Sequence, residues 1–148
     1  MNDYISKLLH LLAEPRTHHS ADDLWCRVVS CGWDECLPTL LAELEAHDPT
    51  VRVLVLEVIS KHGANQGDVA SLKPHVLMML DDSNQSVRHE ALITIESLAW
   101  SDDVESQLRQ IVLRDDPPVA AKALQVLIAF NADEFDKVRT SLKANWPQ

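Results

Sequence analysis

The feature that most constrains the fold is a pattern that the chain repeats three times. Each copy is centred on a valine, and the three valines, Val51, Val87 and Val119, stand 36 and 32 residues apart. Repeats of this length are typical of folds in which one supersecondary unit stacks on the next. Aliphatic residues recur seven positions before each valine and five and eight positions after it: Leu44, Leu56 and Ile59; Leu80, Leu92 and Ile95; Val112, Leu124 and Leu127.

Offsets of five and eight place side chains on one face of an α-helix, which has about 3.6 residues per turn. Equivalent positions in stacked repeats make equivalent packing contacts. We therefore expect six residues to be buried in a core that the repeats share: Leu56, Ile59, Leu92, Ile95, Leu124 and Leu127.

Each repeat is predicted to be two helices joined by a tight turn. In the second repeat, the helices are expected over Pro74–Leu80 and Ser86–Trp100, with a turn of capping residues over 81–84. Asp-Pro at positions 48–49 and 116–117 is typical of an N-cap followed by the first residue of a helix. The β-branched run 51–56 is also compatible with a strand, but its alignment with the second repeat favours a helix.

The flanks are less regular, as the ends of stacked repeats usually are. We expect one helix over 4–12, a second that Ser20 caps and that ends at Gly32, and a last one over 132–143. The prediction is an all-α chain forming one domain, a solenoid of about four to five helical hairpins. Its parts are an irregular N-terminal hairpin over 1–33, three clearer repeats over 34–130 and a capping helix over 131–148.

Two segments carry a resemblance to a known family. The sequence Asp-Pro-Thr-Val-Arg at 48–52 and the sequence Ser-Val-Arg-His-Glu-Ala-Leu at 86–92 resemble the HEAT repeat family, including its HEAT-like, bilin lyase-type members. The third copy departs from the pattern because Ala120 stands where the family has arginine. The resemblance implies that Arg52 and Arg88 are structural and form a ladder of polar contacts between the turns of adjacent repeats.

The resemblance also implies a scaffold whose second helices line a curved binding face. The residues predicted to contact a partner on that face are Glu57, Glu90, Ile93 and Trp100. Leu54, Ile93 and Trp100 are apolar where a solvated helix would be polar, which is typical of an interaction patch. The alternative is that the helical phase is off by one position and these residues belong to the core.

The charge of the chain narrows the class of partner. Thirteen Lys and Arg against 23 Asp and Glu give a formal net charge of −10, which repels nucleic acid and anionic lipid. We expect a protein partner with a basic surface, no nucleic acid and no membrane. Three cysteines, no apolar run long enough to cross a bilayer and no signal-peptide pattern favour a cytoplasmic location.

The sequence contains few residue patterns that indicate a catalytic or metal site. Metal-dependent hydroxylases of HEAT-like architecture need several His-Glu pairs, and here only His89-Glu90 matches. His18, His19, Asp22 and Asp23 could bind a divalent cation, but the two aspartates are explained by the dipole of a first helical turn. Cysteines at 26, 31 and 36 lack the two-residue gap of zinc or redox pairs and are expected to be small packing residues.

The sequence therefore predicts an interaction protein with no catalytic residues, no metal and no cofactor. A small acidic HEAT-like adaptor or inhibitor fits these observations, and one version of it is an antidote to a basic toxin. The alternative is an enzyme or enzyme subunit of the HEAT-like lyase or metal-dependent hydroxylase type.

Overall fold

The structure, a computed structural model, describes residue 10 and residues 21–66 and 70–131 of the chain. Within these residues every regular element is a helix, which confirms the all-α prediction. The chain divides into two compact units, Met1–Trp100 and Ser101–Gln148, which are described separately below. Among the described helices, none has both the length and the apolar character that crossing a membrane requires.

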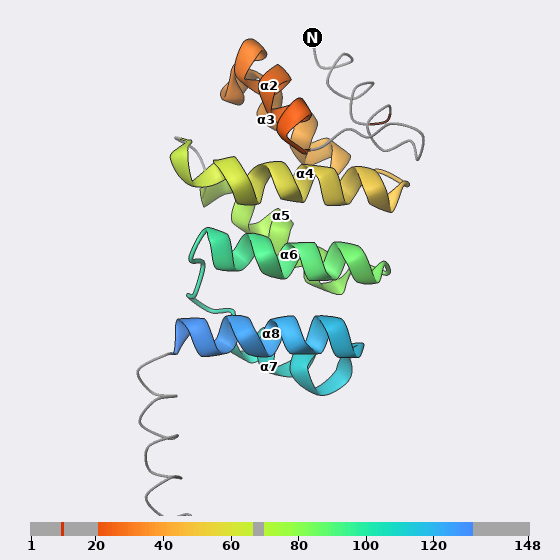
Figure 1. The fold of residues 1–148 in the computed structure, drawn as a ribbon, viewed down its shortest axis with the longest axis vertical. Coiled ribbons are helices and arrows are strands. Elements are labelled where there is room, and N and C mark those ends of the chain that lie inside the picture. The colour runs from red at the N-terminus through yellow and green to blue at the C-terminus, as the bar shows by residue number, and fades with distance from the viewer. Residues whose placement is uncertain (1–9, 11–20, 67–69, 132–148) are drawn as a thin grey trace, which may run out of the picture. The chain divides into compact units, whose positions relative to one another are not determined.

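The helices follow the predicted order of hairpins and turns (Figure 1). The expected helix over 4–12 lies outside the described residues except for residue 10, and the one over 132–143 lies wholly outside them. Unit 1 contains α2 (Ala21–Cys31), α3 (Trp33–Glu43), α4 (Pro49–His62), η1 (Gly63–Asn65), η2 (Ala70–Leu72), α5 (Lys73–Met78), η3 (Met79–Asp81) and α6 (Gln85–Ser97), and unit 2 contains α7 (Glu105–Arg114) and α8 (Pro117–Phe130).

The starts of α4 and α6 are built in the same way. The side chain of Asp48 accepts a hydrogen bond from the backbone N–H of Thr50, at 2.9 Å. Asn84 accepts from the N–H groups of Ser86 and Val87, at 2.9 and 3.3 Å. These N-caps satisfy N–H groups that have no partner inside the helix. The run 51–56 is therefore helical, as the repeat alignment predicted.

The two capped helices lie side by side and run in the same direction, with α5 behind them (Figure 1). Both bury the anchor valine and the residues four, five, seven and eight positions after it, because each helix is covered on more than one side. In α6 the seventh position is Thr94, whose hydroxyl oxygen lies 2.9 Å from the carbonyl oxygen of Glu90 and 3.2 Å from that of Leu56 in α4. The predicted burial of Leu56, Ile59, Leu92 and Ile95 is confirmed.

Arg52 joins the turns of the two repeats, as the ladder prediction expected. Its Nη1 donates to the carbonyl oxygens of Ala46 and His47, at 2.5 and 3.1 Å. Its Nη2 donates to Oδ1 of Asp82 at 3.0 Å, and its Nε makes an ion-pair contact with Oδ2, also at 3.0 Å, without hydrogen-bond alignment. Arg88 repeats the first contact by donating to the carbonyl oxygen of Asp82 at 2.9 Å. Asp82, the acidic residue that Arg52 contacts, lies two residues before the cap residue Asn84.

The junction between α2 and α3 consists of one residue. Gly32 has a φ of 94°, a left-handed conformation that glycine adopts without the strain a Cβ would add. It ends α2 where the sequence predicted. The next helix starts at Trp33, and Pro38 lies inside it. Proline cannot donate the backbone hydrogen bond expected at that position.

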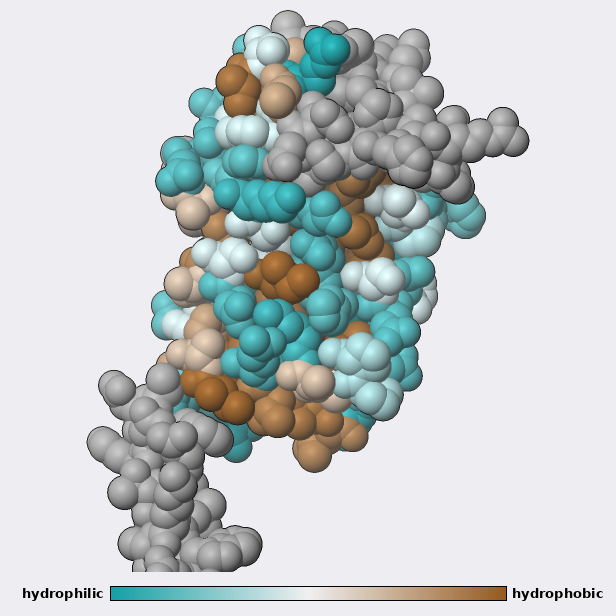
Figure 2. All heavy atoms as spheres, viewed as in Figure 1, coloured by the Kyte–Doolittle hydropathy of each residue, from teal (hydrophilic) through white to brown (hydrophobic). Residues whose placement is uncertain are grey.

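Unit 2 corrects part of the core prediction. Helices α7 and α8 pack together, and α8 buries Val119, Ala123 and Val126, one stripe of the helix. Leu124 was expected in the core but is 48% exposed, and Leu127 is only half-buried. Among the described residues of this unit, α7 alone packs on α8, and a helix covered from one side buries one stripe. Figure 2 shows apolar surface gathered over unit 2.

Candidate protein-interaction surface

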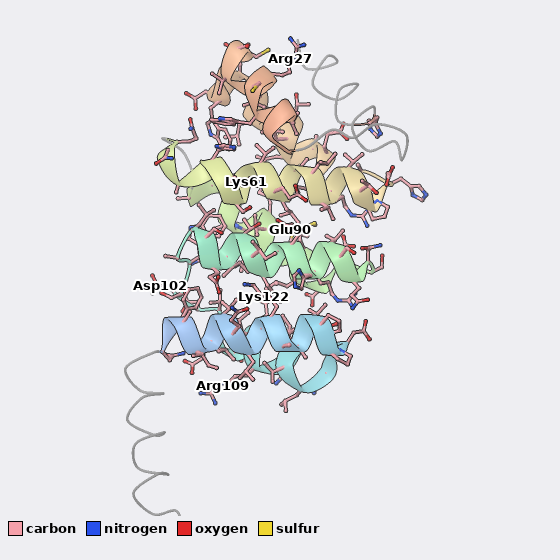
Figure 3. All side chains as sticks on the ribbon, viewed as in Figure 1. Arg27, Lys61, Glu90, Asp102, Arg109 and Lys122 are labelled. Carbon is pink, nitrogen blue, oxygen red and sulfur yellow. The ribbon has the colours of Figure 1, made fainter. Side chains whose placement is uncertain are left out.

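The outward sides of α4 and α6 form the face on which the sequence predicted partner contacts. We call it the α4–α6 face and define it by Glu57, Lys61, Glu90, Ile93 and Ser97. Glu57, Glu90 and Ile93 are half-buried, and Lys61 and Ser97 are exposed. Figure 3 shows Lys61 on α4 and Glu90 on α6. Three of the four predicted contact residues, Glu57, Glu90 and Ile93, therefore lie on this face.

Leu54 is not part of the face. Only 7% of its surface is exposed, so for this residue the core alternative is correct. Its equivalent in the next repeat is Glu90, which is half-buried. Ile93 has Glu57 as its equivalent, and both are half-buried. The two repeats thus place one apolar and one acidic residue at these two positions, in opposite order.

Trp100 lies beyond the end of α6, because that helix ends at Ser97 rather than continuing to Trp100 as expected. Its N–H donates to the carbonyl oxygen of Ile95 and that of Ala99 donates to Glu96, both at 3.0 Å. Ala99 has a φ of 54°. This is the Schellman arrangement, in which the residue after the left-handed position commonly packs against the last turn of its own helix. The half-burial of Trp100 therefore has an explanation within the fold.

The charged residues of the α4–α6 face are partnered. Glu57, Lys61 and Glu90 each take part in a polar or electrostatic contact within the chain, and so does Glu96 beside them. Ile93 is thus an apolar residue among charges that already have partners. A face of this kind has the composition of an interface, with an apolar contact point and a polar rim.

Two tryptophans of the N-terminal hairpin make contacts that the sequence did not reveal. The ring of Trp25 in α2 stacks on His62 at the end of α4, with centroids 4.1 Å apart and planes inclined by 4°. Its ring also meets Trp33 edge-on, at 6.0 Å. Trp33 is buried and Trp25 half-buried. These rings join α2 to α3 and α4, and spacing alone could not have paired residues 25 and 62.

Metal and thiol chemistry have little support in the described part of the chain. No three His, Cys, Asp or Glu side chains come together there as a metal site would need, and His89-Glu90 has no second pair beside it. His18 and His19 lie outside the described residues, as do the side chains of Asp22 and Asp23. Burial is the main cause that raises the pKa of the Cys36 thiol to about 11, with Cys31 and Glu35 adding to it. A thiol with this pKa is a poor nucleophile at neutral pH.

The geometry thus presents a face of two half-buried glutamates, a half-buried isoleucine, an exposed lysine and an exposed serine, held by two equivalent helices. Comparisons with known proteins give no further guide, since no family model, no curated protein and no solved structure matches the chain.

Proposed function

We propose that the chain is a non-catalytic protein-binding module of the HEAT-like type, and that its hairpins stack as a solenoid of about four to five units. The observation that carries this proposal is the equivalence of the α4 and α6 repeats. They share the N-cap, the arginine contact six residues back along the chain and the buried positions. The Arg52–Asp82 contact between the two turns has the form that the family resemblance implies.

The proposed binding surface is the α4–α6 face, with Glu57, Glu90 and Ile93 as contact residues and Trp100 at its edge. The partner is a protein with a basic surface, because the net charge of −10 favours encounter with positive charge. The acids steer the partner to the face, and Ile93 loses exposed apolar surface when the complex forms. No catalytic residue, metal or cofactor is part of this proposal.

The experiment begins with capture of a partner by the tagged full chain and then measures its binding kinetics. The test variant is the double charge reversal Glu57→Lys and Glu90→Lys. The matched control is Glu45→Lys with Asp81→Lys, which changes the net charge equally at two exposed positions outside the face. We expect the test variant to slow association at least tenfold and the control to slow it less than threefold. Equal losses in both would mean that only overall charge matters and would reject the face.

The second part of the test measures how association depends on salt and how truncation of Ile93 or Trp100 changes dissociation. Association of the unmodified chain should slow as salt rises, because exposed charges are screened beyond about 8–10 Å at 0.1–0.15 M ionic strength. Ile93→Ala and Trp100→Ala should act mainly on dissociation, since truncating a buried anchor shortens the lifetime of a complex. If both variants leave the dissociation rate unchanged and the association rate does not change with salt concentration, the α4–α6 face is not the binding surface.

A further inference from the structure

Helix α8 is almost wholly apolar, yet it buries only one stripe. Lys122 and Gln125 are the only polar residues among its 14. A helix that is apolar all round is normally covered on most of its sides. In α8, however, the buried residues are Val119, Ala123 and Val126 alone, and Figure 2 shows apolar surface over this unit. Part of the apolar surface of α8 therefore lacks a covering element among the described residues.

The less buried apolar residues of α8 include a second stripe. We call it the α8 stripe and define it by Ala120, Leu124, Leu127 and Ile128, whose offsets of four, seven and eight share one helical face. Leu124 is 48% exposed, and the other three are half-buried. Covering the stripe would remove apolar surface from water without burying a polar side chain of α8.

The repeats of unit 1 indicate which element belongs on this stripe. Leu56 in α4 is the equivalent of Leu124, five positions after the anchor valine. The carbonyl oxygen of Leu56 lies 3.2 Å from the hydroxyl oxygen of Thr94 in α6, and α4 packs on α6. This part of α4 thus faces the helix of the next repeat, and Leu56 is fully buried. By the equivalence of the repeats, the α8 stripe faces the place of an element that follows α8 in the chain.

The sequence that follows α8 has the length and the pattern to fill this place. Seventeen residues, 132–148, come after Asn131, and they lie outside the described residues. Helices of a hairpin are joined by about 2–5 residues, so enough chain remains to return along the 14 residues of α8. The large apolar residues of the segment recur at intervals of three, four and four: Phe135, Val138, Leu142 and Trp146. This spacing favours one apolar helical face.

We propose that residues 132–148 fold back as an amphipathic helix and dock on the α8 stripe, with their apolar face against Leu124 and Leu127. Removal of apolar surface from water on both sides stabilises the contact. A short tether gives an effective concentration in the millimolar range, so the segment competes successfully with a second copy of the chain. Its polar side then faces solvent, as the terminal caps of repeat proteins do. The proposal concerns unit 2 alone and is independent of the α4–α6 face.

The experiment measures hydrogen exchange of the backbone amides in the full chain by mass spectrometry. We expect the amides of 135–146 to exchange at least about tenfold more slowly than those of an unstructured peptide of the same sequence. Leu124→Glu places a charge in the stripe and should raise these exchange rates at least about tenfold. The matched control is Ala129→Glu, which adds the same charge at an exposed position of α8 outside the stripe. It should change the rates less than about threefold.

A second variant tests the contact from the other side. Leu142→Glu leaves α8 unaltered, so it carries the test even where Leu124→Glu weakens α8 itself. It should accelerate exchange both in 135–146 and in residues 124–130 of α8, because each covers the other. Thr140→Glu, on the polar side of the segment, is its matched control and should accelerate neither.

Three outcomes would overturn the proposal. In the first, residues 135–146 of the unmodified chain exchange as fast as the unstructured peptide. In the second, their protection is the same in Leu124→Glu and Ala129→Glu, and Leu142→Glu leaves exchange in α8 unchanged. In the third, protection grows with protein concentration while sedimentation shows a dimer, which would assign the stripe to a second copy of the chain.

Discussion

Removing the Arg52 guanidinium is the sharpest test of how the two repeats hold together. The side chains of Arg52 and Asp82 are only 11% and 10% exposed, and they meet through two contacts of 3.0 Å. Arg52→Ala leaves the Asp82 carboxylate in this sheltered place with one remaining donor in the turn, the N–H of Asn84 at 2.9 Å. A buried charge that loses its partner is costly because water cannot fully replace that partner.

The magnitude follows from these contacts. Breaking a buried ion pair by removing one partner costs about 3–5 kcal/mol, and a hydrogen bond to a charged group contributes about 1.5–3 kcal/mol. Asp82 keeps the Asn84 donor, and the carbonyl oxygen of exposed His47 can bind water after the truncation. We therefore expect Arg52→Ala to lower the free energy of unfolding by about 2–4 kcal/mol.

The assay is urea unfolding of the full chain, followed by tryptophan fluorescence. With a slope of about 1–3 kcal/mol per molar urea, the expected cost shifts the midpoint by about 1–2 M. Arg27→Ala is the matched control, because Arg27 is exposed on α2 and its loss should cost no more than about 0.5 kcal/mol. Arg52→Lys should restore only part of the stability, since an ammonium group cannot reproduce the planar fork of the guanidinium.

A double-mutant cycle with Asp82→Ala separates the pair from its surroundings. We expect the combined variant to be more stable than the two single costs predict, by a coupling energy of about 1–3 kcal/mol. If the single costs add to within about 0.5 kcal/mol, the two side chains do not stabilise the turns as a pair, and the ladder interpretation fails.

Three further predictions, which compare five substitutions, use the same urea titration. Leu92→Ala should cost about 2–5 kcal/mol because its side chain is fully buried, whereas Leu124→Ala, at a site 48% exposed, should cost at least about 1 kcal/mol less. Ala99→Gly should stabilise by about 1 kcal/mol, since a φ of 54° strains alanine and suits glycine; a lowered midpoint would contradict this. Thr94→Val should destabilise by about 0.5–1.5 kcal/mol, whereas Thr39→Val should be neutral or stabilising, because the buried Thr39 hydroxyl has no hydrogen-bond partner among the described residues.

Local chemistry explains what the sequence predicted well. The caps at Asp48 and Asn84 depend on side chains and N–H groups two or three residues away, so a short motif contains all the partners. The buried stripe around Val51 and Val87 depends on helical period and on a neighbour of the same kind, which a repeat supplies. These features are fixed within one hairpin or between two equivalent ones.

Features that depend on unlike neighbours were missed. Leu124 has the same phase as Leu92, yet its burial depends on what packs against α8, and phase alone does not tell how many sides are covered. The stack of Trp25 on His62 joins residues from two hairpins of different form.

Packing within the fold explains the apolar character of some predicted contact residues but not of others. Trp100 follows a left-handed helix end, where an apolar residue commonly packs against its own helix, so its presence needs no partner. Ile93 is different, because the equivalent position in the preceding repeat is Glu57 and both are half-buried. Packing in this repeat type therefore accepts a glutamate there, and the fold does not require the isoleucine. Of the predicted contacts, Ile93 is therefore the residue on which the proposed binding face depends most.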